Sequence, residues 1–185
     1  MRSQLRRTSA VLAVAALLAA GTLPHAADAA LTPEQSAALS EASANGSDAL
    51  GTELGVQVLA APETWPDLLA QALAIDPNSA AYFAALLALL LPTQAVEIAT
   101  AAGGANDPLV VAAVAAAVPA ATGALEETFG PIDPSNSAAA SGHADKARDT
   151  KEASQRAASG GQRGGDGGLQ NETSSLQDDG TPSPN

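Results

Sequence analysis

The sequence predicts an all-α protein: a compact array of short, antiparallel, alanine-rich helices that are started by prolines, followed by a disordered C-terminal tail. Of the 185 residues, 46% are hydrophobic but only 2% are aromatic, so alanine supplies much of the apolar content. Alanine has the highest intrinsic helix propensity. The absence of cysteine excludes disulfides and thiolate metal sites. Five prolines recur at intervals of 11 to 16 residues: Pro62, Pro77, Pro92, Pro108 and Pro119.

Residues 1–29 predict a secretory signal peptide. Three arginines near the start precede an uncharged apolar run over 10–20, and the segment ends with Ala27-Asp28-Ala29, a small-x-small pattern. Export machinery recognises this order of basic, apolar and small residues. We expect cleavage after Ala29 and export to the periplasm or the medium. An uncleaved membrane anchor is the alternative, but the apolar run is shorter than the roughly 20 residues of a membrane span.

The spaced prolines predict repeated helix starts. Proline is tolerated in the first turn of a helix and disrupts the interior, so each one marks the beginning of a new element. The body of the protein, residues 30–130, should therefore be a single alanine-rich helical domain. The expected helices are 33–44, 48–60, 65–75, 77–91, 92–102, 108–118 and 119–128.

Residues beside these prolines predict the caps. The segment Thr32-Pro33-Glu34-Gln35 has the pattern of a capping box, and Thr64 with Asp67 repeats its spacing. Asp76 and Asp107 each precede a proline and are expected as N-caps. The pairs Asn45-Gly46 and Gly103-Gly104 are expected to end helices.

The helix at 77–91 is expected at the centre of the protein. No charge follows Asp76 within it, and its apolar residues cover a broad surface. Trp65 is an interface anchor or a core residue, and we favour the core. The apolar run 80–91 is too short to span a membrane. Regular proline spacing leaves two architectures open, a helical bundle and a short helical solenoid.

Residues 131–185 predict the disordered tail. The composition changes there to Ser, Gly, Asp, Asn and Pro, with few large apolar residues. The mixed-charge stretch 141–159 could form a transient helix, but it has no evident face to bury. Such a segment cannot offset its own conformational entropy.

The charges exclude several kinds of chemistry. Between residues 30 and 135 there are twelve acids and no lysine, arginine or histidine. The one histidine after the signal segment, His143, falls in the predicted tail. A serine or cysteine nucleophile needs a nearby base to activate it, and this segment has none. It also lacks the histidine and cysteine ligands of a zinc site, and the lysines and arginines that bind phosphates and nucleic acids. No catalytic, cofactor-binding or metal-binding residues are predicted.

Carboxylates remain as candidates. A carboxylate pair could hydrolyse a glycosidic bond, but such sites usually offer aromatic platforms, which are scarce here. Glu126, Glu127 and Asp133 could bind calcium, although they lack EF-hand spacing. The glycine-rich run 164–169 contains one imperfect copy of a calcium repeat. Scattered acids are more often solvated surface residues.

The sequence therefore predicts an exported, non-enzymatic, acidic helical module that acts through protein–protein contacts. Its charge favours a partner with a basic surface and opposes nucleic acid. No transmembrane span is expected once the signal is removed. The alternative function is a membrane- or envelope-associated structural or assembly protein. The partner and the oligomeric state are left open.

Overall fold

The computed structural model describes residues 31–160; the predicted signal peptide and residues 161–185 lie outside this range. The described residues form α-helices and short 3-10 turns, with no strand, so the predicted all-α fold is confirmed. The α-helices are α1 Pro33–Ser43, α2 Ser47–Ala60, α3 Trp65–Ile75, α4 Ala80–Leu90, α5 Ala95–Ala101, α6 Pro108–Ala117, α7 Thr122–Phe129 and α8 Ser137–Gly160. The 3-10 turns are η1 Pro62–Thr64, η2 Pro77–Ser79, η3 Pro92–Gln94, η4 Pro119–Ala121 and η5 Pro134–Asn136.

Prolines start the elements, as predicted. Helices α1 and α6 begin on a proline, and each 3-10 turn begins on a proline and leads directly into the next α-helix. The residue before the proline leaves the helical conformation, with φ of −144° at Ala61 and −128° at Leu91. Proline's ring excludes the α region for the residue before it. Helices α2, α3, α4 and α6 therefore end beside a proline, and the chain reverses over a very short connection. Helices α1, α5 and α7 end instead near Gly46, Gly103 and Gly130, which have positive φ.

The predicted caps are confirmed in part. Thr32 and Gln35 form the reciprocal capping box, and Asp107 accepts a hydrogen bond from the backbone N–H of Leu109. Asp76 instead accepts from the Ser79 hydroxyl, and the Thr64 hydroxyl donates to the carbonyl of Ala61. Asp76 does not cap an α-helix, because the 3-10 turn η2 occupies residues 77–79, where the α-helix was expected to begin. Helix α3 begins at Trp65 as expected, but the Thr64 side chain makes no capping hydrogen bond to it, since Thr64 ends the turn η1 and its hydroxyl bonds back to Ala61.

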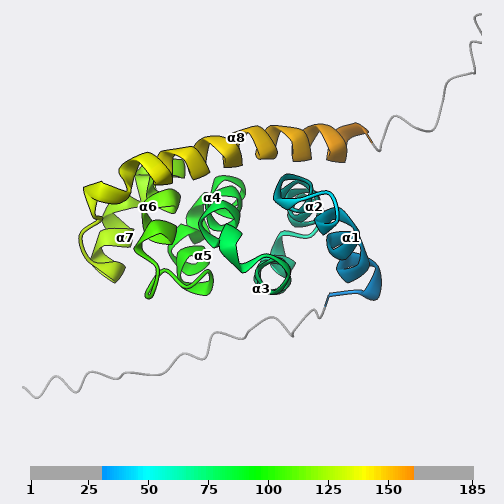
Figure 1. Cartoon of the computed structure of the whole chain (residues 1–185), viewed down its shortest axis with the longest axis horizontal. Coiled ribbons are helices and arrows are strands. Elements are labelled where there is room, and N and C mark those ends of the chain that lie inside the picture. The colour runs from blue at the N-terminus through cyan, green and yellow to red at the C-terminus, as the bar shows by residue number, and fades with distance from the viewer. Residues whose placement is uncertain (1–30, 161–185) are drawn as a thin grey trace, which may run out of the picture.

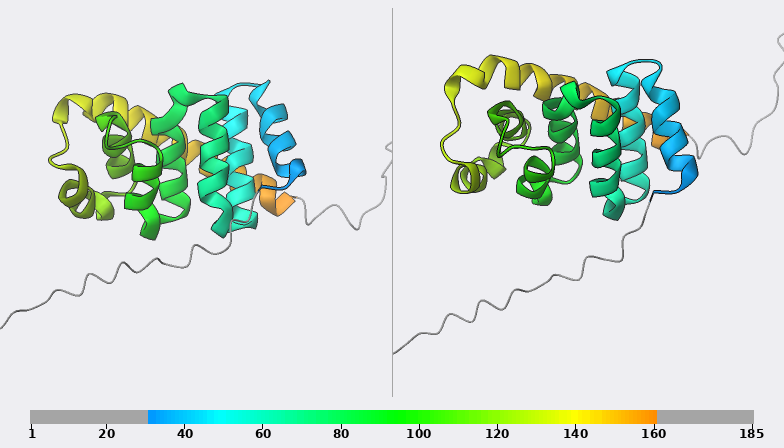
Figure 2. Two further views of the ribbon diagram at one scale, coloured as in Figure 1. Left: turned by 90° about the horizontal axis from the view of Figure 1, so that it is seen from below. Right: turned by 60° about the horizontal axis from the view of Figure 1, so that its bottom comes forward.

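The helices alternate between two layers (Figures 1 and 2). Helices α2, α4 and α6 are neighbours in one layer, and α1, α3, α5 and α7 are neighbours in the other. Consecutive helices thus change layer, as in a helical solenoid, one of the two architectures that the sequence left open. The long helix α8 lies across the free face of the α2–α4–α6 layer and contacts all three helices (Figure 1). This crossing helix closes the array into a compact bundle.

Helix α4 is central, as its composition predicts. All residues from Ala81 to Ala88 are buried, including Tyr82 and Phe83. Trp65 is 7% exposed at the start of α3, which confirms it as a core residue. Alanine on most faces lets the helix axes approach closely, and the scarce large side chains fill the space between them.

The prediction that the disordered tail begins at residue 131 was wrong, because α8 forms within it. We expected disorder throughout 131–185, yet residues 137–160 form the longest helix of the described chain. Its buried face consists of small side chains: Ala140, Ala144, Ala147, Thr150 and Ser154. Small residues do not register as a hydrophobic stripe, which is why the sequence showed no face to bury. Their lack of bulk is what lets α8 pack tightly on the body.

Candidate functional site

Within the described residues, the charged side chains of the body are all acidic, whereas α8 carries both acidic and basic ones. The twelve carboxylates of residues 31–135 are all exposed or half-exposed: Glu34, Glu41, Asp48, Glu53, Glu63, Asp67, Asp76, Glu97, Asp107, Glu126, Glu127 and Asp133. Every lysine and arginine of the described range lies on α8: Lys146, Arg148, Lys151 and Arg156. The body therefore presents a surface with one sign of charge.

Three of the α8 cations bind the body. Lys146 forms an ion pair with Asp48 at the start of α2 and lies 4.3 Å from the centre of the Tyr82 ring. Lys151 Nζ donates to the carbonyl of Leu89 at 3.0 Å, and Arg148 Nη2 donates to that of Ala116 at 2.8 Å. Both carbonyls lie in the last turn of a helix, where they lack helical partners and the helix dipole is negative. These cations thus serve to attach α8.

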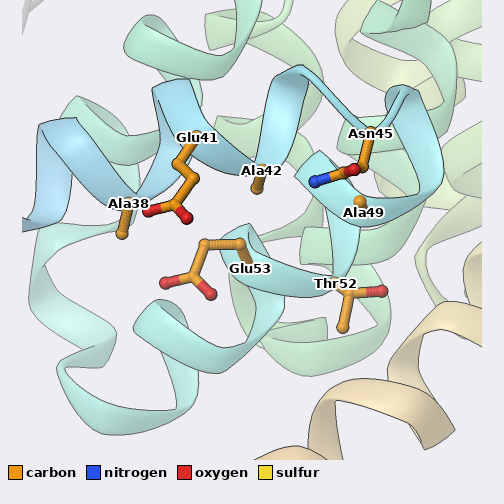
Figure 3. A pocket seen from close by; sticks show the side chains of 7 residues that line it. All are labelled: Ala38, Glu41, Ala42, Asn45, Ala49, Thr52 and Glu53. Atoms are coloured by element: carbon orange, nitrogen blue, oxygen red, sulfur yellow. The ribbon is translucent and has the colours of Figure 1, made fainter.

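An acidic groove between α1 and α2 is the candidate site (Figure 3). It has a volume of about 510 Å³ and is open to solvent. In Figure 3, Glu41 from α1 and Glu53 from α2 extend their carboxylates into the same space between the helices. The groove is lined by Ala38, Glu41, Ala42, Asn45, Ala49, Thr52 and Glu53. Three of these residues are alanines, which leave room for a side chain of another molecule.

Local structure positions the two carboxylates. The Asn45-Gly46 turn, predicted as a helix end, contains Gly46 at φ +96°, which folds α2 back against α1. Buried Gln57 then connects the helices: its Nε2 donates to Glu53 Oε1 at 2.9 Å and to the carbonyl of Gln35 at 3.2 Å. Glu53 is held in place by this amide, whereas Glu41 is exposed.

This arrangement suits a cationic side chain. Lysine and arginine combine an aliphatic stem with a charged end. The stem would lie on the alanine methyl groups, and the charged end would meet the carboxylates of Glu41 and Glu53 through charge-assisted hydrogen bonds. The signal in the sequence is that Glu41 and Glu53 lie on either side of a helix-reversing Asn-Gly turn, on two helices that this turn folds against each other. Sequence reasoning missed it because acids were considered as scattered residues.

The other sequence candidates lie elsewhere. Asp133 Oδ1 accepts a hydrogen bond from the backbone N–H of Ser135 at 2.8 Å, and this bond lowers the pKa of Asp133 below its usual range. Among residues 31–160, no three acidic or histidine side chains converge on a metal-sized site, Glu126, Glu127 and Asp133 included. His143 is half-buried on α8. The glycine-rich run 164–169 lies outside the described residues.

Comparison of the chain with protein-family models, with curated proteins and with solved structures gave no match. Among the described helices, none is both long and apolar enough to cross a membrane. The apolar residues of α4, considered above as a candidate for membrane insertion, are covered by neighbouring helices.

Tyr82 links the body to α8 and gives a pH-dependent prediction. Its hydroxyl lies 2.8 Å from Thr150 Oγ1, whose own proton is donated to the carbonyl of Lys146. Burial, with a smaller effect from the negative charge of Asp48, raises the pKa of Tyr82 from 10.0 to about 12. The unfolded chain ionises first, so this contribution to stability is complete below pH 10 and is lost as the pH rises to about 12.

We expect the free energy of unfolding to fall by on the order of 2 kcal/mol across this interval because of Tyr82. Urea unfolding on either side of it, for the wild type and for Tyr82→Phe, measures the effect. The phenylalanine variant should lose less stability in alkali, since it has no group to ionise. An equal loss in both proteins would contradict the assignment. Tyr82 is the single tyrosine, so tyrosinate absorbance reports its ionisation directly.

Proposed function

We propose that this protein is an exported acidic binding module that recognises a lysine- or arginine-rich surface of another protein. The observation that carries the proposal is the pair of carboxylates, Glu41 and Glu53, held over an alanine-lined groove. Export is supported by the signal-peptide pattern of residues 1–29. A binding role is supported by the surface position of the body's carboxylates; within residues 31–160, the only lysines and arginines are those of α8.

The uniform charge of the body contributes to the rate of binding. Twelve acids within residues 31–135 create a negative potential that attracts a basic partner over distances of several ångströms. Salt screens this attraction, with a Debye length of about 8 Å at physiological ionic strength. Association should therefore slow as salt is added, while the groove contacts control dissociation.

The test compares two double variants against a lysine-rich fluorescent peptide. Glu41→Gln with Glu53→Gln removes the groove carboxylates and keeps the side-chain shapes. Glu97→Gln with Glu127→Gln removes two exposed charges from α5 and α7, so it changes the net charge equally. We expect the groove variant to bind the peptide about ten-fold more weakly, equivalent to about 1.4 kcal/mol. The matched control should change affinity about two-fold or less.

Two outcomes would overturn the proposal. Equal losses in both double variants would mean that only the net charge matters and that the groove is not a site. Flotation of the protein with neutral-lipid vesicles, together with no affinity for the peptide, would favour the alternative of an envelope-associated structural protein. Anisotropy titrations at two salt concentrations provide the affinities.

A further inference from the structure

The turn between α1 and α2 contains an asparagine followed by a glycine. Asn45 and Gly46 are both exposed, and Asn45 is one of the residues that line the acidic groove. In Figure 3 the amide of Asn45 extends from the turn toward Ala42 and Ala49, which line the same groove. A change in the charge of this side chain is therefore a change in the charge of the groove.

The backbone nitrogen that follows an asparagine is positioned to attack its side chain. In this reaction the nitrogen of Gly46 loses its proton and forms a bond to Cγ of Asn45, while the bond from Cγ to the side-chain nitrogen breaks and ammonia leaves. Water then opens the resulting five-membered succinimide ring at either of its two carbonyl groups. The products are aspartate and isoaspartate, and both carry a carboxylate in place of the neutral amide.

Gly46 leaves the attacking nitrogen accessible. It adopts φ +96°, and no atom lies within 4 Å of the position that a Cβ would occupy. A side chain here would hinder the approach of the nitrogen to Cγ, and it would also disfavour this backbone conformation. Because glycine has no side chain, neither obstacle is present in this turn.

The four asparagines of residues 31–160 differ in the residue that follows them. Asn45 precedes glycine, whereas Asn78 and Asn136 precede serine and Asn106 precedes aspartate. At all four sites the following backbone N–H donates a hydrogen bond, which must break before the nitrogen reacts: Gly46 to Ser43, Ser79 to Asp76, Asp107 to Gly103 and Ser137 to Pro134. Since this bond is common to the four sites, the glycine is what distinguishes Asn45.

We propose that Asn45 is a site of spontaneous deamidation, and that its conversion adds a third carboxylate to the acidic groove. The modification follows from the geometry of the turn alone, whereas its effect on a bound lysine or arginine rests on the proposed function. The new carboxylate joins those of Glu41 and Glu53, so a cationic side chain meets three negative charges in place of two. The protein gains affinity for a basic partner as it ages.

Mass spectrometry of the aged protein tests the modification. The protein is incubated in mildly alkaline buffer, where the backbone nitrogen loses its proton more readily, and is then cleaved after glutamate. Each asparagine is then carried by its own peptide: Asn45 by 42–53, Asn78 by 64–97, Asn106 by 98–126 and Asn136 by 128–152. We expect conversion at Asn45 to be on the order of ten-fold faster than at the other three, because it alone precedes glycine. Conversion at Asn45 that is no faster than at Asn78 would overturn the inference.

Binding of the lysine-rich peptide tests the effect on the groove. Asn45→Asp carries the charge of the product from the start, and Asn45→Gln keeps a neutral amide that does not form the five-membered ring. We expect Asn45→Asp to bind the peptide about two- to five-fold more tightly than the fresh wild type, the usual contribution of an exposed charge. Ageing should move the affinity of the wild type toward that of Asn45→Asp and leave that of Asn45→Gln unchanged.

A matched charge and the groove variant complete the test. Asn106→Asp adds the same charge in the connection between α5 and α6 and should leave the affinity nearly unchanged. Equal gains from Asn45→Asp and Asn106→Asp would overturn the effect on the groove. If the Glu41, Glu53 double variant binds normally while Asn45 still converts, the proposed function fails and the modification site stands. If that variant binds weakly but Asn45 stays intact, the proposed function stands and this inference fails.

Discussion

Phe83→Ala is expected to lower the free energy of unfolding by about 3–5 kcal/mol, the usual range for removing a buried phenylalanine. Phe83 is fully buried on α4, and its ring centre lies 5.2 Å from that of Tyr82. Helix α4 is contacted by α2, α6 and α8, so a cavity here affects both the layer and the crossing helix. Alanine neighbours are too short to fill the space that the ring leaves.

Urea unfolding followed by tryptophan fluorescence measures this loss. Trp65 is the single tryptophan and is buried, so its emission reports the loss of the core. Leu59→Ala is the control, because Leu59 is 38% exposed and its truncation leaves little cavity. We expect that variant to lose less than about 1 kcal/mol. A loss at Phe83 as small as the control's would mean that α4 is not the centre of the core.

Gly51→Ala and Gly142→Ala are expected to change stability in opposite directions. Alanine is favoured over glycine inside a helix by about 1 kcal/mol, and both residues lie within helices. At Gly142 no atom lies within 4 Å of the added Cβ, so the variant should gain up to that amount. At Gly51 the added Cβ would lie 2.2 Å from the Tyr82 hydroxyl.

The clash at Gly51 outweighs the gain in helix propensity. The Tyr82 ring is buried beneath Lys146, and its hydroxyl is bonded to Thr150, so it cannot move aside freely. Overpacking of this kind costs about 1–3 kcal/mol. Thermal and urea unfolding of the two variants give the comparison. A Gly51 variant as stable as the Gly142 variant would show that α2 and α4 are packed more loosely than the structure indicates.

The acidic groove shows how far sequence analysis reached toward the site. The Asn45-Gly46 turn was predicted, and it is the turn that brings Glu41 and Glu53 to one space. Pairing the two glutamates required the register between α1 and α2, which the hydrogen bonds of buried Gln57 help to set. A buried glutamine that joins two helices has no signature in composition or periodicity. The sequence identifies Glu41 and Glu53 as acidic residues, but it does not show that their carboxylates extend into one groove.

Local sequence predicts most helix boundaries of the body to within one residue, and the larger errors are the starts of α4, α5 and α7, where a 3-10 turn precedes the α-helix. A proline excludes the helical conformation from the residue before it, and alanine favours helix in the segments between, so neighbouring residues alone decide these boundaries. Whether residues 137–160 form a packed helix depends on tertiary contacts. Their small residues have no strong preference for burial, and their decisive contacts lie far away in the chain: Ser154 with Thr52 and Lys146 with Ser47 are separated by 102 and 99 residues. Close packing on glycine and charge attraction to helix ends exist only once the body has folded.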